Sequence, residues 1–363
     1  MFNNSRIIIC GGGTGGHLFP AISIKTQLSN RGAQVLYMGS KHGIESIRMT
    51  KDKNTYFLDI KGIHRTLSIS NIIENITFPF KVVTSIIKSL KIIYQYNPMI
   101  VIGTGGYSSG IPLISAIILR KKILLQEQNS YPGITTRILS RFSNKVCIAY
   151  NESTKYIKTN TIFSGNPIRS DFKIIKKNDA KAILNISKYK FTIFICGGSQ
   201  GSKPINEHII NNLNYYNNLN ANIIWQCGFN HYKKISKLNL NTNIKLFDFI
   251  NKMDQVYSAC DLVVSRSGAL TLSEINFFGK ASILIPFPSA AGNHQHKNAL
   301  VSKHNNASIL IKQNNLIKGE LEKNIEKLIN SPEDLYVMEN GARSLSTPNS
   351  IDIILKEIQS LLC

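Results

Sequence analysis

The chain has 363 residues, of which 43% are hydrophobic and 18% charged, a composition typical of globular proteins and unlike that of disordered ones. Its net charge of +22 favours an anionic partner, which could be a nucleic acid, an anionic lipid surface or a phosphorylated substrate. The six cysteines are scattered without a paired motif, so neither a zinc site nor a disulfide framework is indicated, and a reducing compartment fits best.

Short Ile- and Val-rich runs alternate with longer amphipathic segments along the chain. The predicted strands are Arg6–Cys10, Gln34–Met38, Met99–Gly103, Lys122–Gln126, Lys145–Ala149, Phe191–Cys196, Ile223–Cys227, Ile244–Phe247, Leu262–Ser265 and Ser282–Pro286. Helical segments such as Pro20–Asn30, Pro79–Tyr96, Pro204–Leu213 and Thr271–Phe278 lie between them. This βαβα pattern, present twice, predicts an α/β fold of two doubly wound, Rossmann-like domains with parallel sheets. Ligands of such sheets bind at the carboxyl ends of the strands.

The boundary between the two domains is expected near Gly165–Ser170, where a polar connector and a helix lead to the first strand of the second half. We therefore predict domains over residues 1–168 and 169–346. The last helix, roughly Ser350–Leu362, could pack on either half.

The first strand runs into a glycine-rich turn, IIICGGGTGGHLFP, at Ile7–Pro20. A strand, a glycine loop and a helix start together point N–H groups and a positive helix end at one spot, which suits a phosphate. A dinucleotide site would also want an acid at the end of the second strand, but that strand ends in Gly39 and Ser40, which argues against NAD. His17 stands at the helix start, where the positive helix end disfavours its protonation, so it could accept a proton; the alternative is a capping or packing histidine.

Three further polar segments follow strands of the first half. They are the glycine run at 101–110, the segment QEQN at Gln126–Asn129, and Gly165–Arg169. All should lie along the same edge of the sheet. The guanidinium of Arg169 has a fork of donors that suits a diphosphate, although single arginines in loops are usually just solvated.

The second half repeats the glycine turn as CGGSQG at Cys196–Gly201, where Ser199 can offer its hydroxyl and its N–H to a phosphate; the alternative is a tight turn without function. The run SRSGALTLSE at Ser265–Glu274 again goes from strand through glycine to helix start. Glu274 could accept from two vicinal hydroxyls, or could simply favour the helix start. Gln295 could bond sugar hydroxyls. The acids form no cluster, so a divalent metal holding a diphosphate is not expected.

In this order and spacing, from GGTGGH at Gly12–His17 to HQ at His294–Gln295, the motifs resemble the MurG family of bacterial cell-wall glycosyltransferases. The resemblance implies the GT-B fold, in which two Rossmann-like domains face a cleft and the C-terminal helix, about 347–363, packs back on the first domain. It also implies a hexosyltransferase that needs no cofactor and no metal, and that transfers N-acetylglucosamine from UDP-GlcNAc to the muramyl 4-hydroxyl of lipid I, with inversion, to give lipid II.

By the same resemblance, His17 is the expected general base, with Glu127 as the rival. The residues expected to bind the substrates are Thr14, Gly15, Gly16, Asn129, Arg169, Ser199, Ile250, Ala269, Leu270, Thr271, Leu272, Ser273, Glu274 and Gln295. The family commonly reads HEQN where this chain has QEQN. Gln126 cannot serve as a base, so that position is either non-catalytic or compensated here.

Lipid I is a membrane lipid, but no run of the chain approaches the roughly 18 apolar residues of a membrane span. The resemblance therefore implies peripheral binding at the cytoplasmic face of the plasma membrane. Residues 1–170 hold 21 Lys and Arg against 6 Asp and Glu, which would attract anionic lipid. Within Leu67–Tyr96 we expect an apolar docking patch in a loop, with lysines nearby, and core positions on the helix after it. The patch residues are Ile69, Ile72, Ile73, Ile76, Phe78 and Phe80; the lysines are Lys81, Lys88 and Lys91; the core positions are Val82, Val83, Ile86, Ile87, Leu90 and Ile93.

Two other readings share some of these features. A diacylglycerol glucosyltransferase of the same fold would have the same loops and the same membrane contact. A nucleic-acid-binding protein would explain the charge, but the sequence has no recognised binding motif for it and no interleaving of basic and aromatic residues.

Overall fold

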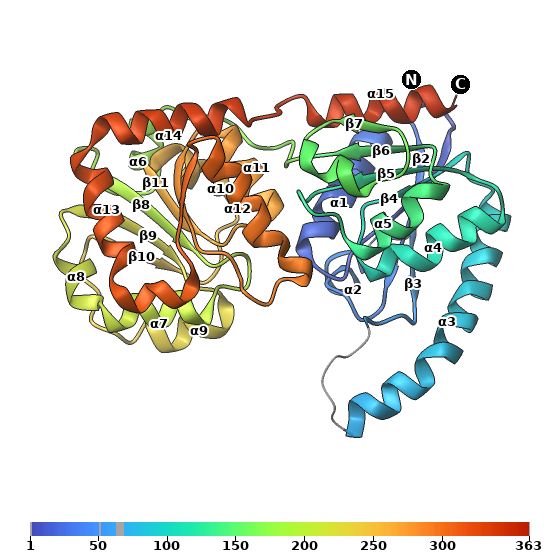
Figure 1. The fold of residues 1–363 in the computed structure, drawn as a ribbon, viewed down its shortest axis with the longest axis horizontal. Coiled ribbons are helices and arrows are strands. Elements are labelled where there is room, and N and C mark those ends of the chain that lie inside the picture. Colours follow the sequence, from blue (N-terminus) through green and yellow to red (C-terminus); the bar gives the residue numbers. More distant parts are fainter. Residues whose placement is uncertain (1, 51, 63–68, 363) are drawn as a thin grey trace. The chain divides into compact units, whose positions relative to one another are not determined.

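The computed structural model describes residues 2–50, 52–62 and 69–362, with residues 69–77 described by their backbone alone. The chain divides into two units, one of Met1–Arg169 with Pro348–Cys363 and the other of Ser170–Thr347. Each unit is a parallel sheet with helices on both faces (Figure 1). The predicted pair of doubly wound parallel sheets is confirmed.

The sheet of the first unit has the strand order β3-β2-β1-β4-β5-β6-β7. Its strands are β1 (Arg6–Cys10), β2 (Gln34–Ser40), β3 (Thr55–Leu58), β4 (Ile100–Gly103), β5 (Lys122–Glu127), β6 (Lys145–Ile148) and β7 (Thr161–Phe163). Its helices are α1 (Gly15–Asn30), α2 (Glu45–Arg48), α3 (Ile69–Tyr96), α4 (Tyr107–Ile118), α5 (Ile134–Leu139) and α15 (Ser350–Leu362), with short 3-10 turns η1 (Ser140–Phe142) and η2 (Asn151–Tyr156). β1 and β4 are neighbours at the centre of the sheet. β2 and β3 follow on the side of β1, and β5, β6 and β7 follow on the side of β4.

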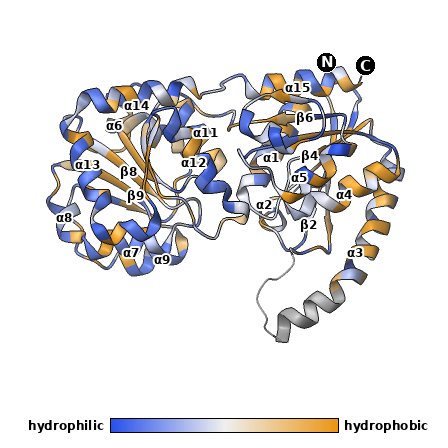
Figure 2. Ribbon diagram, viewed as in Figure 1, coloured by the Kyte–Doolittle hydropathy of each residue, from blue (hydrophilic) through white to orange (hydrophobic). Residues whose placement is uncertain are grey.

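Successive residues of each strand serve opposite faces of this sheet, so the unit has two apolar layers. On one face Ile7 and Ile9 pack with residues of α1 and α15, and on the other Ile8 packs with residues of α3 and α4. Figure 2 shows apolar residues along the strands of both sheets. The helix α15 contributes Ile354 and Ile358, both fully buried, so the end of the chain completes the core of the first unit.

The sheet of the second unit has the order β10-β9-β8-β11-β12-β13. Its strands are β8 (Phe191–Cys196), β9 (Ala221–Gln226), β10 (Ile244–Phe247), β11 (Leu262–Ser265), β12 (Ala281–Leu284) and β13 (Ser308–Leu310). Its helices are α6 (Lys177–Ile183), α7 (Lys203–Asn211), α8 (Leu213–Asn218), α9 (Phe229–Ile235), α10 (Met253–Ala259), α11 (Ala269–Phe277), α12 (His294–His304), α13 (Glu320–Asn330) and α14 (Pro332–Ser344), with 3-10 turns η3 (Ala291–Asn293) and η4 (Gln313–Lys318). Two apolar layers again enclose the sheet, with Ile193 and Ile195 on one face and Phe194 on the other.

The prediction for α3 was wrong at its start. The helix begins at Ile69 and contains Pro79, so the apolar residues expected in a loop belong to the helix backbone. Their spacing, with isoleucines at 69, 72, 73 and 76, is itself helical, and Pro79 misled because proline also favours the first turn of a helix. The side chains of Ile69, Ile72, Ile73 and Ile76, together with Leu67, lie outside the described residues.

The expected core face of α3 was also partly wrong. Ile93 is buried, and Val82 and Ile86 pack against the core, but Val83 and Ile87 are 54% and 61% exposed. Apolar residues thus lie on more than one side of α3, and only one side meets the sheet. Among the residues described, no helix is both long and apolar enough to cross a lipid bilayer.

Candidate active site

Each sheet has a topological switch point at its central strand pair, where the chain stops adding strands on one side and begins to add them on the other. The switch point lies between β1 and β4 in the first unit and between β8 and β11 in the second. Ligands of doubly wound sheets bind at such switch points, beyond the carboxyl ends of the strands. In the first unit, glycine loops follow both central strands and touch each other. The N–H of Gly12 donates to the carbonyl of Gly105 at 3.4 Å, and a Cβ added to Gly106 would lie 2.2 Å from the carbonyl oxygen of Gly12. Only glycines permit this approach.

His17 lies in the first turn of α1, which begins earlier than the predicted Pro20. Its Nδ1 is 2.8 Å from Oε1 of Gln128 and 3.1 Å from the carbonyl oxygen of Thr104. Both neighbours are oxygens that can only accept, so Nδ1 carries the ring hydrogen of the neutral imidazole, and Nε2 carries the lone pair. A Cβ on Gly105 would lie 2.9 Å from Nδ1, so the glycines after β4 also make room for the ring.

Gln126, the departure from the family pattern, is fully buried. Its Nε2 donates to Oδ1 of Asn166 at 3.1 Å, and its Oε1 accepts from Nε2 of Gln128. Since no part of the side chain is exposed, Gln126 faces protein groups and can touch a substrate only if the loops move. Sequence reasoning could not find Gln128 and Asn166 as partners, because their contacts exist only in the folded chain.

Glu127 and Asn129 form a closed local arrangement. Glu127 is 1% exposed, and its Oε1 accepts from the backbone N–H of Asn129 at 3.0 Å and from Nδ2 of Asn129 at 3.2 Å. Its Oε2 accepts from the N–H of Gly133 at 3.2 Å. The carboxylate of Glu127 therefore holds the loop after β5 in shape.

Glu45 is a site residue that the sequence analysis missed. It is fully buried; its Oε2 accepts from the N–H of Gly13 at 2.8 Å, and its Oε1 accepts from the N–H of Ser40 at 2.9 Å. The carboxylate thus ties the first glycine loop to the end of β2. A Cβ on Gly12 would lie 2.6 Å from the Glu45 carboxyl carbon, which explains a glycine there. The sequence did offer one signal for Glu45, because residues 1–170 contain only 6 Asp and Glu.

The remaining predicted residues of the first unit lie around this loop. Thr14 is the residue before α1 in extended conformation, and Thr14 and Gly16 are exposed, with Gly15 half-buried. Arg169 is the last residue of the unit's first segment and is half-buried. The first turn of α1 therefore offers N–H groups next to the His17 ring.

In the second unit the loop after β8 has Ser199 exposed at its tip. Gly201 has a φ of 76°, and a Cβ there would lie 1.9 Å from the carbonyl oxygen of Cys227, so the loops after β8 and β9 pack backbone to backbone. Gln226, which the sequence analysis missed, braces them. Its Nε2 donates to the carbonyl of Gly198 at 3.1 Å, and its Oε1 accepts from the N–H of Ile250 at 2.9 Å.

The helix α11 begins at the switch point of the second sheet. Gly268 precedes it and has no side chain to cap the N–H groups of Ala269, Leu270 and Thr271, which also lack acceptors within the helix. Its positive end suits an anion. Leu272 and Ser273 were predicted to bind substrate, but their side chains contact the protein itself. Leu272 packs in the core, and the Ser273 hydroxyl donates to the carbonyl of Ala269 at 3.0 Å.

Glu274 is half-buried on α11, and its Oε2 accepts from the hydroxyl of Tyr257 on α10 at 3.0 Å. Burial, followed by the negative charge of Glu274, raises the pKa of the Tyr257 hydroxyl well above its usual range. The hydroxyl therefore stays protonated and keeps donating. Tyr257 is fully buried and orients the carboxylate, a role that the sequence did not reveal.

Arg266, also missed, links three loops at the carboxyl edge of the second sheet. It donates to Oγ of Ser202 at 2.8 Å, to Oε1 of Gln313 at 2.6 Å and to the carbonyl of Pro286 at 3.0 Å. Burial lowers the pKa of Arg266 to about 10, so it remains a cation at neutral pH. The Oε1 of Gln295 accepts from the N–H of Phe287 at 2.9 Å, which orients this amide.

In the part of the chain that the structure describes, no group of three or more His, Cys, Asp and Glu side chains is arranged to hold a metal ion. The donors gathered at both switch points are instead N–H groups, hydroxyls and amides. These groups suit phosphates and sugar hydroxyls.

Comparison with known proteins agrees with this geometry. Residues 7–148 match the glycosyltransferase family 28 N-terminal domain, and residues 192–352 match the glycosyltransferase family 28 C-terminal domain. A relative from Flavobacterium psychrophilum, described as a UDP-N-acetylglucosamine–N-acetylmuramyl-(pentapeptide) pyrophosphoryl-undecaprenol N-acetylglucosamine transferase, is 37% identical, and the alignment covers 98% of each chain. A relative with the same description from Listeria monocytogenes is 33% identical over 98% of this chain and 99% of its own.

Solved structures show the same relationship. The crystal structure of Acinetobacter baumannii MurG is 26% identical, covers 98% of this chain and 99% of its own, and superposes with a TM-score of 0.77. The calicheamicin glycosyltransferase CalG4 is 9% identical, with a TM-score of 0.71 over 99% of this chain and 98% of its own, and shares the fold. The chain therefore belongs to glycosyltransferase family 28, among the MurG enzymes.

Proposed function

We propose that this protein transfers N-acetylglucosamine from UDP-N-acetylglucosamine to the muramyl pentapeptide of a pyrophosphoryl-undecaprenol lipid, forming lipid II from lipid I. The observation that carries the proposal is the match to family 28 in both halves of the chain, with relatives named for this reaction along their full length. The sites at the two switch points supply groups that suit this chemistry.

The second unit, about 169–346, is proposed to bind UDP-GlcNAc. The diphosphate would lie against Ser199 and the first-turn N–H groups of α11, a turn that contains no acidic residue. Glu274, held by Tyr257, would accept from the ribose hydroxyls. The backbone of Ile250 would meet the uracil, and Gln295 would meet the sugar.

The first unit, about 1–168 with the C-terminal helix, is proposed to bind the acceptor. Thr14, Gly15 and Gly16 at the start of α1 would face the acceptor diphosphate, with Asn129 nearby. The transfer requires the acceptor hydroxyl and the sugar donor to meet, so the two units act on one reaction.

We propose His17 as the general base. The muramyl 4-hydroxyl would attack the anomeric carbon of the donor while Nε2 of His17 takes its proton. The bond from the anomeric carbon to the diphosphate oxygen breaks, and its electron pair leaves with UDP, so the configuration inverts. The lone pair on Nε2 supports this role, whereas Glu127 is buried with both oxygens bonded to its own loop.

The charge on the leaving diphosphate would be met by N–H groups at a helix start, by Ser199 and by Arg169, without a metal ion. Such donors are preorganised and cost no rearrangement during the reaction. The proposal is therefore that transfer continues in the presence of a chelator.

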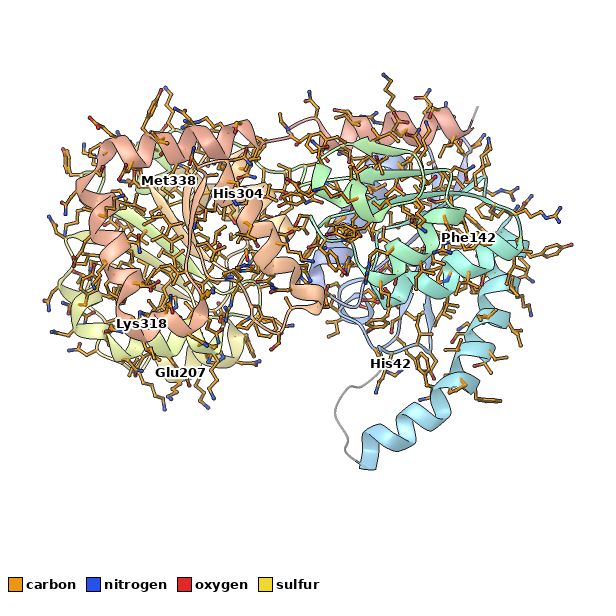
Figure 3. All side chains as sticks on the ribbon, in the orientation of Figure 1. His42, Phe142, Glu207, His304, Lys318 and Met338 are labelled. Atoms are coloured by element: carbon orange, nitrogen blue, oxygen red, sulfur yellow. The ribbon has the colours of Figure 1, made fainter. Side chains whose placement is uncertain are left out.

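A peripheral site on the cytoplasmic membrane surface is proposed for the lipid acceptor. Apolar side chains are exposed on α3 and on α5–η1, including Phe80 at 75% and Phe142 at 55% (Phe142 is labelled in Figure 3). On both elements they alternate with cations, which are Lys81, Lys88 and Lys91 on α3 and Arg137 and Arg141 on α5–η1. Such a surface suits an anionic lipid bilayer.

The direct test is a turnover assay with UDP-GlcNAc in EDTA, using either a lipid I analogue or diacylglycerol as acceptor. We expect transfer to the lipid I analogue alone. Transfer to diacylglycerol would instead support the glucosyltransferase alternative.

Calorimetry tests the donor site separately. Glu274→Ala removes two hydrogen bonds to a charged acceptor, so UDP-GlcNAc affinity should fall about a hundredfold. Glu333→Ala, which removes an exposed acid from the first turn of α14, is the matched control and should bind normally. Equal affinity in the two variants would exclude this placement of the ribose.

A further inference from the structure

The orientation of the Gln128 amide, together with the carbonyl of Thr104, sets which nitrogen of His17 can accept a proton. A glutamine amide presents an acceptor at one end and a donor at the other, and a half-turn exchanges them. With Oε1 of Gln128 toward Nδ1, the ring hydrogen stays on Nδ1 and Nε2 is a base. With the donor end toward Nδ1, the hydrogen would favour Nε2, which could then accept nothing.

Gln128 is held in the productive orientation by two main-chain carbonyls and by the side chain of Gln126. The Nε2 of Gln128 donates toward three oxygens, the carbonyl of Thr104 at 2.9 Å, the carbonyl of Gln126 at 2.9 Å, and Oε1 of Gln126. The side chain of Gln126 supplies one of the three, and the other two are main-chain carbonyls. Both glutamines are buried, so water does not compete for these positions.

Asn166 fixes Gln126 in turn. Its Oδ1 accepts from Nε2 of Gln126 at 3.1 Å, and its Nδ2 donates to the carbonyl of Gln128 at 3.1 Å. Gln126, Asn166 and Gln128 therefore form a closed ring of buried amides, in which each donor end meets an oxygen. Reversal of Gln126 or Asn166 would set donor against donor, and reversal of Gln128 would set its oxygen against three other oxygens.

We propose that Gln126 and Asn166 are positioning residues, which hold Gln128 so that His17 keeps its hydrogen on Nδ1 and its lone pair on Nε2. The inference rests on the proposed role of His17 as base. It explains how this chain works with glutamine at position 126. Position 126 must supply one donor, to Asn166, and one acceptor, to Gln128, and a neutral imidazole also has one donor and one acceptor.

The test combines ¹⁵N-histidine NMR with kinetics on the full-length protein. Gln126→Leu removes both polar ends at similar volume, and Gln126→Met does so with a more adaptable side chain if the leucine variant does not fold. We expect a measurable fraction of His17 to move its hydrogen to Nε2. The kcat should fall about tenfold while the KM for UDP-GlcNAc stays unchanged, since one buried hydrogen bond is lost. Gln126→His should restore both the tautomer and kcat.

Asn222→Leu is the control, because Asn222 is likewise a buried amide, bonded to the Ser187 carbonyl and to the Thr192 hydroxyl in the second unit. It should lower stability and leave the His17 tautomer unchanged. An unchanged tautomer in the Gln126 variants would overturn the proposal, even if kcat fell. A shifted tautomer with normal turnover would uphold the positioning role and refute His17 as the base.

Discussion

Gly106 is the position where a single methyl group should do most damage to the site in the first unit. Its φ of 79° is costly for alanine, by about 1–2 kcal/mol. A Cβ would also lie 2.2 Å from the carbonyl oxygen of Gly12, which is backbone and cannot rotate away, so the two glycine loops must separate. Overpacking of this kind costs about 1–3 kcal/mol.

Together these terms give a loss near 3 kcal/mol for Gly106→Ala, or roughly 6–12 °C in the melting temperature of a unit of this size. The same Cβ would lie 3.1 Å from Cδ2 of His17 and would displace the ring. Misplacement of a catalytic group lowers kcat, by up to about a hundredfold for a shift of about 1 Å, so turnover should fall within that limit. UDP-GlcNAc affinity should be unchanged, because the proposed donor residues belong to the second unit.

Differential scanning calorimetry, turnover and donor-binding calorimetry measure the three effects. Gly110→Ala is the control, because Gly110 lies within α4 and the nearest atom to its added Cβ is 3.9 Å away. Alanine there should raise stability slightly, by about 0.5–1 kcal/mol. The reasoning fails if Gly106→Ala melts and turns over like the wild type, or if Gly110→Ala is equally damaged.

Further predictions concern other parts of the molecule. Tyr257→Phe should weaken UDP-GlcNAc binding about tenfold, because Glu274 loses the hydrogen bond that orients it; calorimetry showing wild-type affinity would contradict this. Burial alone would raise the pKa of Glu322. Hydrogen bonds from the imidazole of His208 on α7 and the hydroxyl of Tyr216 on α8 outweigh burial and lower that pKa below its usual 4.5. The ionised carboxylate therefore stabilises the fold above that pH, and the contribution is lost as the pH falls through the lowered value. Melting temperatures between pH 3 and 7 should show a shallower acid decline for Glu322→Gln, and parallel curves would speak against it. Charge reversal of Lys81, Lys88 and Lys91 should weaken binding to anionic vesicles, and unchanged sedimentation with vesicles would exclude this face.

The sequence predicted the centre of each sheet better than its edges. The central strands β1, β4, β8 and β11 are strongly apolar and end in glycine turns, so both their type and their ends were readable. The edge strand β10 was predicted with its observed bounds, Ile244–Phe247, but the edge strands β3, β7 and β13 were missed, since three or four residues such as Thr161–Phe163 often carry too little periodicity to distinguish a strand from a loop. These segments are strands because they pair with a neighbouring strand in the folded protein.

The site divides in the same way. Glycines, helix starts and His17 are local signals, and they could be read from the sequence. Glu45, Gln128, Tyr257 and Arg266 act through partners elsewhere in the chain; His17 and Gln128, for example, are 111 positions apart, so these roles follow only from the fold. The alternative that position 126 is non-catalytic gains support from the burial of Gln126.

The imidazole of His17 is proposed to take the acceptor proton without help from a metal ion. The most direct measurement is the rate of N-acetylglucosamine transfer to a lipid I analogue in EDTA, for the wild type and His17→Ala, with the UDP-GlcNAc dissociation constant measured on the same samples. We expect full transfer by the wild type, a loss of at least about a hundredfold in kcat for His17→Ala, and equal donor affinity for both. Transfer by His17→Ala at the wild-type rate, or a wild type that is inactive until magnesium is added, would contradict it.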